Sequence, residues 1–163
     1  MIPIYPYSSE FTKKFKKEKV RLEMILGDGV RIEHFGSTAI PGVLGKGVVD
    51  IIIGFDSWVD VQKAIPLLQI NGYILSYDNQ RKDRIFLSTA GKKESSFLDI
   101  HLHLTNKNSS VFKDALLFRD YLKKNRELKK QYNQLKEQIV KIVKNDRKLY
   151  TKLKSNFIKK ILN

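Results

Sequence analysis

The stretch RIEHFGSTAIPGVLGKGVVDIIIGF, residues 31–55, contains the pattern that decides the fold. Residues 30–35 alternate weakly between apolar and polar side chains and are typical of a strand. A glycine-rich loop follows, and residues 48–55 are almost wholly apolar, as in a central strand buried on both faces. The exception is Asp50, an acid at the start of a hydrophobic strand. A carboxylate in such a place needs a partner or a ligand.

Composition indicates a folded protein with one core. The chain has 163 residues, 42% of them hydrophobic and 10% aromatic, which favours a globule over a disordered chain. We therefore expect a single domain over 1–163, with a sheet unit at 1–106 and a basic helical cap at 107–163. The chain has no cysteine, which excludes disulfides, thiolate zinc sites and cysteine nucleophiles. This is compatible with the reducing cytosol, and we expect a cytoplasmic protein.

The remaining periodicities predict an α+β fold with a mixed sheet and flanking helices. A helix is expected from Ser8 or Ser9 to Leu26, and a second from Ser57 to about Gln69, in which Pro66 should cause a kink or an early end. Three further strands are expected at 73–76, 84–89 and 97–104. Three amphipathic helices then follow, the first capped by Ser109 or Ser110 and the others starting before Leu128 and before Tyr150.

The net charge of +14 is unevenly distributed. Residues 107–163 contain 17 of the 31 Lys and Arg residues but only 5 of the 17 Asp and Glu residues. A basic block of this kind can attract nucleic acid, nucleotides or an anionic surface. It is equally typical of solvated helix faces, and composition does not separate these interpretations.

The Gly36-Ser37 pair and Asp50 together indicate a phosphate site. A Gly-Ser at a strand end lets backbone N–H groups approach a phosphate closely, and the hydroxyl adds a donor. A carboxylate on the next strand can hold a divalent metal that grips phosphate oxygens. Lys46 lies in the same loop and can add a positive charge. The alternative is a structural turn beside a hydrogen-bonded acid.

The run FLDIHLHL, residues 97–104, adds a second group of polar side chains. Its two-residue period places Asp99, His101 and His103 on one face of the strand and its apolar residues on the other. Two histidines and a carboxylate suit a transition metal better than magnesium. The alternative is that the histidines form hydrogen bonds to the helical cap.

The segment HFGSTAIPGVLGKGVVDIII, residues 34–53, resembles the signature of the GrpB family, also called UPF0157. The resemblance continues, in order, through HLHL, LLFRDYLKKN at 116–125, QYNQLK at 131–136 and LYTKLKSNFIKKIL at 149–162. It covers nearly the whole chain. One departure is Gly47, where the family usually has proline, and this should loosen the loop without changing its chemistry.

The resemblance implies a nucleotidyltransferase fold like that of polymerase β. Such proteins use a Gly-Ser motif, an Asp-x-Asp/Glu motif and a third acid. Gly36, Ser37 and Asp50 match, Asp99 is the expected third acid, and Ile52 replaces the second carboxylate. Because transfer by two metals needs several carboxylates, this departure weakens a magnesium site. His101 and His103 would complete a different metal site, with Mg²⁺, Mn²⁺ or Zn²⁺ as candidates.

The resemblance also implies a role for basic residues of the helices. Arg119, Lys136, Tyr150 and Lys154 match positions that stand out in the family pattern. Arg119 is the best candidate, because its planar guanidinium grips phosphate bidentately, although it can instead pair with Asp120 or Asp99. The full set expected at phosphate is Gly36, Ser37, Thr38, Lys46, Arg119 and Lys154.

We therefore expect binding of a nucleotide or another small phosphate-bearing ligand, with metal-dependent nucleotidyl or phosphoryl transfer if the protein is an enzyme. The alternative is a non-catalytic binding or regulatory module that has lost the second carboxylate. RNA binding through the basic helices ranks third, since Tyr132, Tyr150 and Phe157 fall on the apolar stripes. No apolar run approaches the length of a membrane span, and the sequence leaves the oligomeric state open.

Overall fold

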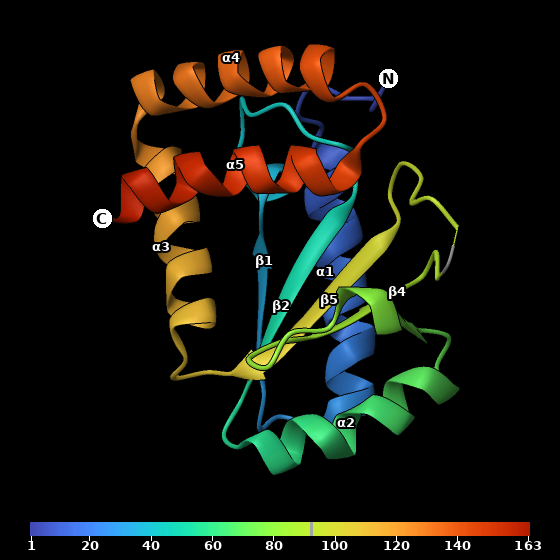
Figure 1. The fold of residues 1–163 in the computed structure, drawn as a ribbon. Coiled ribbons are helices and arrows are strands. Elements are labelled where there is room, and N and C mark those ends of the chain that lie inside the picture. Colours follow the sequence, from blue (N-terminus) through green and yellow to red (C-terminus); the bar gives the residue numbers. More distant parts are fainter. Residues whose placement is uncertain (92) are drawn as a thin grey trace.

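The computed structural model describes residues 1–91 and 93–163, apart from the side chain of Asn79. Its centre is a five-stranded mixed sheet in the order β1-β2-β5-β4-β3 (Figure 1). The central strands β2 and β5 are parallel, and every other neighbouring pair is antiparallel. The strands are β1 (Arg31–Phe35), β2 (Val49–Phe55), β3 (Ile74–Leu75), β4 (Ile85–Ser88) and β5 (Ile100–Asn106).

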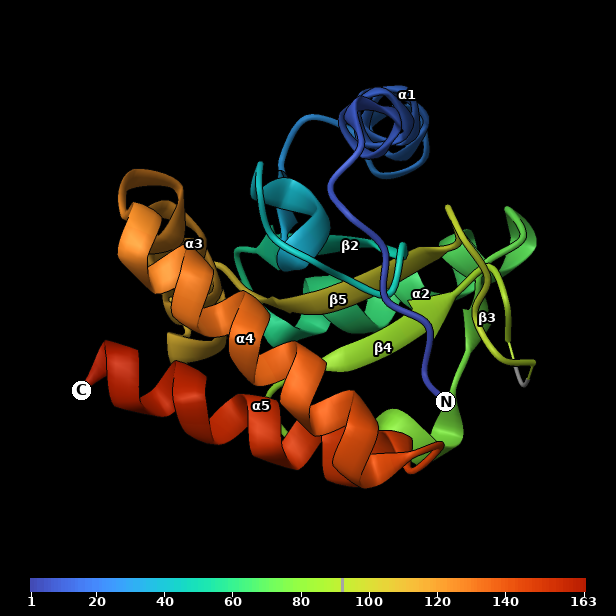
Figure 2. The same cartoon turned by 90° about the horizontal axis from the view of Figure 1, so that it is seen from above.

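Helices lie on both faces of this sheet, as Figure 2 shows from above. Helices α1 (Ser9–Leu26) and α2 (Trp58–Ile70) cover one face and form the main apolar core with alternate residues of β2 and β5. On the opposite side lie α3 (Ser110–Lys124), α4 (Arg126–Val143) and α5 (Arg147–Leu162). The predicted α+β class, with a mixed sheet and three C-terminal helices, is confirmed.

The helix boundaries follow the capping residues in the sequence. The hydroxyl of Ser57 accepts from the Asp60 N–H at 3.1 Å, which completes the expected cap of α2. The helix continues through Pro66 to Ile70, so the proline does not end it early. Ser109 accepts from the Phe112 N–H at 3.2 Å and caps α3.

The expected strand 97–104 begins later in the structure, at Ile100. Leu98 has a positive φ of 67°, and its N–H donates to the Gly47 carbonyl at 2.7 Å. The Asp99 N–H donates to the Ser96 carbonyl at 3.1 Å, which closes a turn. The alternating pattern therefore starts inside a turn, and Asp99 is outside β5.

The helical cap is attached directly to the sheet unit. Asn133 of α4 accepts from the Leu44 N–H at 2.8 Å and donates to the Gly42 carbonyl at 2.9 Å. The Ile2 N–H donates to the Lys144 carbonyl at 2.9 Å, so the N-terminus lies at the end of α4 (Figure 1). Among the described residues, no helix has both the length and the apolar character needed to cross a membrane.

Candidate functional site

Asp50 lies on the face of β2 that points toward the helical cap. The register pairs it with Phe35 of β1 and His101 of β5, so it occupies the middle of the sheet rather than an edge. The neighbouring residues Val49 and Ile51 point to the opposite face and are fully buried in the main core. The Asp50 side chain is 28% exposed and is therefore partly buried between the sheet and the cap.

Both histidines of β5 approach one oxygen of this carboxylate. The distance from His101 Nδ1 to Asp50 Oδ1 is 3.4 Å, and the distance from His103 Nε2 to the same oxygen is 3.3 Å. Burial opposes the charge of Asp50, but the two histidine contacts outweigh it and hold its pKa well below the usual value. Burial lowers the pKa of His103 to about 4 against the attraction of Asp50, so this imidazole is neutral near pH 7.

The Gly36-Ser37 turn lies against the other carboxylate oxygen. Gly36 has a φ of 69°, and a Cβ built on it would lie 2.9 Å from Asp50 Oδ2. Glycine is therefore required here both by the backbone conformation and by the space that the carboxylate occupies. The turn and the acid, which the sequence suggested as one site, are adjacent in the structure.

Lys136 of α4 joins this turn from the helical cap. Its side chain is fully buried, and its ammonium donates to the Ser37 hydroxyl and to the Leu44 carbonyl. The ammonium also lies 4.2 Å from the centre of the Tyr132 ring. Burial, followed by repulsion from Lys154, lowers the pKa of Lys136 well below its usual value.

Two further lysines approach from the loop before β2 and from α5. The amines of Lys46 and Lys154 lie 5.6 Å and 5.7 Å from the centre of the Tyr150 ring. Burial and the charge of Lys154 lower the pKa of Lys46 to about 8, and Asp50 opposes both effects. Burial also lowers the pKa of Lys154 against the attraction of Asp50.

These three amines, Lys46, Lys136 and Lys154, form what we call the lysine triad. Within the described residues, no carboxylate forms an ion pair within 4.0 Å with any member of the triad. Asp50 is the acid whose charge acts on all three. The site therefore brings three amines with lowered pKa values within electrostatic reach of one carboxylate, and a bound anion would favour their charged forms.

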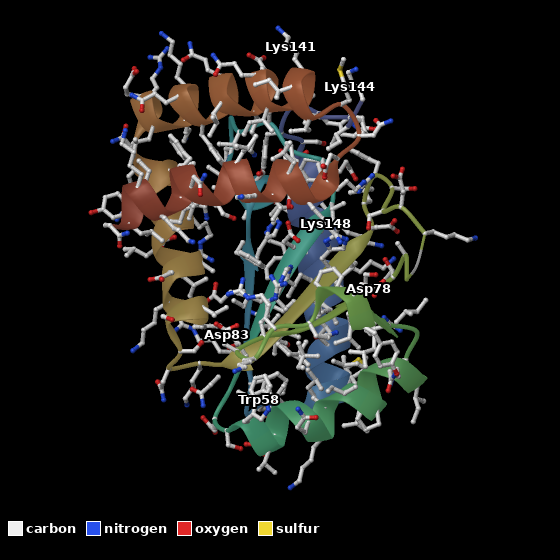
Figure 3. All side chains as sticks on the ribbon, viewed as in Figure 1. Trp58, Asp78, Asp83, Lys141, Lys144 and Lys148 are labelled. Atoms are coloured by element: carbon white, nitrogen blue, oxygen red, sulfur yellow. The ribbon has the colours of Figure 1, made fainter. Side chains whose placement is uncertain are left out.

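Other lysines are arranged differently. Lys141, Lys144 and Lys148, labelled in Figure 3, are exposed around the connection between α4 and α5. Two hollows also occur, one of about 390 Å³ between α4 and α5 and one of about 420 Å³ between α4 and the loop at Pro41 and Gly42, and neither is lined by Asp50 or the triad. The candidate site is thus defined by buried charge rather than by these hollows.

Arg119 of α3 is not part of this group. Its guanidinium donates to Glu33 at 3.0 Å, to the His34 carbonyl at 2.9 Å and to Asp120 at 2.9 Å. Burial opposes its charge, but the two carboxylates outweigh it and raise its pKa. These contacts attach α3 to β1, and the expected pairing with Asp120 is the one that the structure contains.

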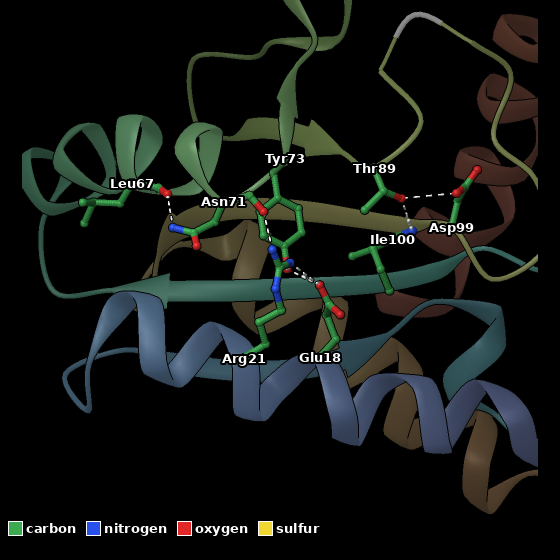
Figure 4. Close-up of polar contacts among 8 residues, drawn as sticks. All are labelled: Glu18, Arg21, Leu67, Asn71, Tyr73, Thr89, Asp99 and Ile100. Atoms are coloured by element: carbon green, nitrogen blue, oxygen red, sulfur yellow. Dashed lines mark hydrogen bonds and ion pairs between the residues drawn. The ribbon is translucent and has the colours of Figure 1, made fainter.

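Asp99 is also separate from the Asp50 group. Figure 4 shows its carboxylate accepting from the Thr89 hydroxyl, at 3.2 Å, while the Ile100 N–H donates to the same hydroxyl. Its other oxygen accepts from the Ser96 N–H at 2.6 Å. Asp99 stabilises the turn before β5, so among the described residues it does not supply a second acid beside Asp50.

Thr38 faces another part of the fold. Its hydroxyl forms a hydrogen bond with His34 Nε2 at 2.9 Å, and both residues are buried. The His34 ring stacks on the Phe15 ring of α1, with 4.8 Å between the ring centres. The Thr38 hydroxyl therefore links the turn to His34 of β1, and its described hydrogen bond is not to a lysine of the triad.

Sequence reasoning undervalued Lys136 and did not identify Ser95. Tyr132, Lys136, Val140 and Val143 are all buried, so a lysine lies on the apolar stripe of α4. A lysine at such a position is a signal that sequence alone can supply. Ser95, whose hydroxyl lies 2.7 Å from His101 Nε2, comes from a polar loop with no distinctive pattern.

The fold of this protein is similar to that of solved structures. It resembles the crystal structure of the conserved protein GrpB from Enterococcus faecalis, with a TM-score of 0.79 and 22% identity over 99% of this chain and 100% of that chain. It also resembles Cid1 in complex with its short product ApU, with a TM-score of 0.57 and 16% identity over 83% of this chain and 44% of that chain. The fold is nucleotidyltransferase-like.

The chain belongs to the GrpB protein family, whose profile matches residues 1–163. The glutamate-rich protein GrpB of Alkalihalophilus pseudofirmus is 33% identical over 160 residues, which are 96% of this chain and 91% of that protein. The family resemblance that the His34-to-Ile53 segment suggested is confirmed.

The metal pair expected of this fold does not fit the residues present. Ile52 stands where a second carboxylate would be needed, is 1% exposed and packs with Phe112 and Leu116 of α3. Asp99, the expected third acid, instead accepts hydrogen bonds from Thr89 and Ser96 in the turn before β5. Asp50 is left as the carboxylate of the group, with two histidines beside it.

Proposed function

We propose that this protein binds a nucleotide or another small phosphate-bearing ligand between the Gly36-Ser37 turn and the lysine triad. The observation that supports this most strongly is the triad itself. The charge of one carboxylate, Asp50, acts on all three amines, and an uncompensated buried charge destabilises a fold. Phosphate oxygens would supply the missing negative charge and accept several charge-assisted hydrogen bonds at once.

Each element of the site has a distinct part in this proposal. The backbone at Gly36 and the Ser37 hydroxyl approach the ligand from the sheet, while Lys46 and Lys154 approach from the loop and from α5. Lys136 orients the Ser37 hydroxyl and adds charge behind it. A divalent cation held by Asp50 would link this carboxylate to the phosphate oxygens.

The test is equilibrium binding of ATP by titration calorimetry with EDTA present, so that the amines act without metal. We expect Lys154→Met to weaken binding by about tenfold or more, as for one lost charge-assisted contact. Lys152→Met, which removes an exposed lysine from the same helix, serves as the matched control and should bind like the parent. Equal losses in both variants would show that binding depends only on net surface charge.

Metal-dependent nucleotidyl or phosphoryl transfer is the second candidate, favoured by the nucleotidyltransferase-like fold and by Asp50. Against it stands Ile52, which supplies no ligand and is enclosed by α3. The two functions differ in an assay of labelled-triphosphate turnover with Mg²⁺, Mn²⁺ or Zn²⁺. Turnover that disappears in Asp50→Asn would establish an enzyme, whereas ATP binding without turnover supports the binding module.

RNA binding through the basic helices remains third. Binding of single-stranded RNA normally uses exposed aromatic rings on which bases stack. Tyr132 and Tyr150 are each 2% exposed and lie beneath the triad, so they offer no such platform. A small ligand fits these residues better than a polymer does.

A further inference from the structure

Asp50, His101 and His103 are arranged in a way that hydrogen bonding explains poorly. Hydrogen bonds between a charged group and a nitrogen donor are typically about 2.7–2.9 Å long. The two histidine nitrogens lie 3.4 Å and 3.3 Å from the same oxygen, Asp50 Oδ1. Both contacts are therefore long, and one oxygen receives both.

The same distances match the spacing of donor atoms around a tetrahedral ion. Zinc binds nitrogen and oxygen ligands at about 2.0–2.1 Å, which separates two tetrahedral ligands by about 3.3–3.4 Å. An octahedral magnesium ion with similar bond lengths brings adjacent ligands to about 2.9 Å. One donor atom from each of Asp50, His101 and His103 lies within 4.8 Å of the other two.

The surroundings of the histidines add two independent observations. His103 is 8% exposed, and among the described residues its Nδ1 atom has no hydrogen-bond partner, so Asp50 is its described polar contact. His101 Nε2 lies 2.7 Å from the Ser95 hydroxyl, which fixes the ring with Nδ1 toward Asp50. A hydrogen bond at the far nitrogen is the usual support for a metal-binding histidine.

The sheet holds these donors in place. Asp50 pairs with His101, and Ile52 pairs with His103, in the parallel register of β2 and β5. Edge-to-face ring contacts constrain both imidazoles further. The ring centres of Phe35 and His103 are 4.9 Å apart, and those of Phe86 and His101 are also 4.9 Å apart. A group on two paired central strands is more rigid than one on loops, which favours selective metal binding.

We propose that Asp50, His101 and His103 bind one divalent ion of the zinc class, in place of the pair of magnesium ions expected of this fold. Two imidazoles and one carboxylate are a donor set that late transition metals prefer to magnesium. Three protein ligands leave one coordination position open for water or an exogenous ligand. Only the identity of that fourth ligand, a phosphate oxygen, rests on the proposed function.

The experiment is a metal titration of the untagged protein without any nucleotide, using competition with a chromophoric zinc chelator. We expect one Zn²⁺ per chain, bound at least about 100-fold more tightly than Mg²⁺. Co²⁺ in the same site should give the intense visible absorption of tetrahedral coordination. His103→Gln and His101→Gln should each lose this binding and the Co²⁺ spectrum.

His34→Gln is the control, because the third histidine of the chain bonds Thr38 instead of Asp50. Circular dichroism checks that each variant is folded. Metal binding that is equal for Mg²⁺ and Zn²⁺, or that survives both histidine substitutions, would overturn the proposal, as would the lack of saturable Zn²⁺ binding by the folded parent protein. Because no nucleotide is present, failure here leaves the EDTA-resistant binding of ATP untouched, and the two proposals fail separately.

Discussion

At the scale of single residues, the site depends on groups that are unfavourable to the fold. A glycine in a left-handed conformation leaves room for a carboxylate, and three lysines lose part of their hydration without gaining an acidic partner. Such arrangements lower stability and are typical of ligand sites.

Gly36→Ala should lower the free energy of unfolding by about 1–3 kcal/mol, because alanine resists the positive φ and its Cβ would press on Asp50. Urea denaturation measures the change. Gly29→Ala is the control, since a Cβ at Gly29 meets nothing within 4 Å and its φ is not in the positive range. A Gly36→Ala variant as stable as the Gly29→Ala variant would mean that the turn is not held against the acid.

Lys46 should make stability rise with pH. Its pKa is about 8 in the folded protein and 10.5 in the reference state, so the unfolded chain binds more protons between these values. The cost of burying the charge is fully present below about pH 8 and disappears toward pH 10.5, which gives a gain of about 1–3 kcal/mol after allowance for partial exposure.

The measurement is urea denaturation of the parent protein and of Lys46→Met at a series of pH values in this window. As the pH increases, the free energy of unfolding of the parent protein should rise relative to that of Lys46→Met. Lys148→Met, which removes an exposed lysine, should run parallel to the parent protein. Parallel curves for Lys46→Met as well would contradict the depressed pKa.

At the scale of elements, the position of α3 is set by Arg119. Its side chain is 13% exposed and links Glu33 and the His34 carbonyl of β1 to the helix. The sequence suggested that Arg119 binds phosphate, because arginine suits that role. In the structure its guanidinium instead forms hydrogen bonds with Glu33, Asp120 and the His34 carbonyl. The expected consequence is structural.

Arg119→Met should lower the free energy of unfolding by about 1–3 kcal/mol, because it leaves the partly buried Glu33 to the more exposed Arg31 and removes the hydrogen bond to the His34 carbonyl. The affinity for ATP should stay within about twofold of the parent value, a change of less than 1 kcal/mol. Lys113→Met, an exposed position on the same helix, is the control for charge. A large loss of ATP affinity with unchanged stability would instead place Arg119 at the ligand.

Element boundaries also show how far the sequence could be interpreted. Caps such as Ser57 and Ser109 and the apolar run of β2 are local signals, and the structure follows them. The start of β5 was wrong because alternation continues through a turn in which Leu98 is left-handed, which depends on the contact with Gly47. Likewise, Asp99 shares the sequence period of the histidines, but a turn removes it from their face.

At the scale of the whole molecule, the site lies where the sheet unit and the helical cap meet. Asp50 and the Gly36-Ser37 turn come from the sheet unit, whereas Lys136 and Lys154 come from the cap. Residue chemistry alone indicated Asp50 and the Gly36-Ser37 turn, and the family resemblance added Lys136 and Lys154. Sequence could not show that Lys136 is fully buried or that Arg119 is already paired, because both facts depend on long-range packing.

Unfolding should occur in one transition, because hydrogen bonds from Asn133 and Lys136 cross between residues 1–106 and 107–163. Fluorescence of Trp58, the single tryptophan, reports on the start of α2, while circular dichroism is sensitive to all helices, including the three of the cap. The two denaturation curves should coincide. An early loss of helical signal with unchanged tryptophan fluorescence would instead indicate that the cap unfolds independently.

The most direct test of the central claim is a crystal structure of the protein with bound pyrophosphate. We expect the anion beside the Ser37 hydroxyl, with its oxygens about 3 Å from the amines of Lys46 and Lys154, a normal hydrogen-bond distance. Pyrophosphate bound instead to exposed lysines such as Lys141 and Lys148, with the triad unchanged, would contradict the account.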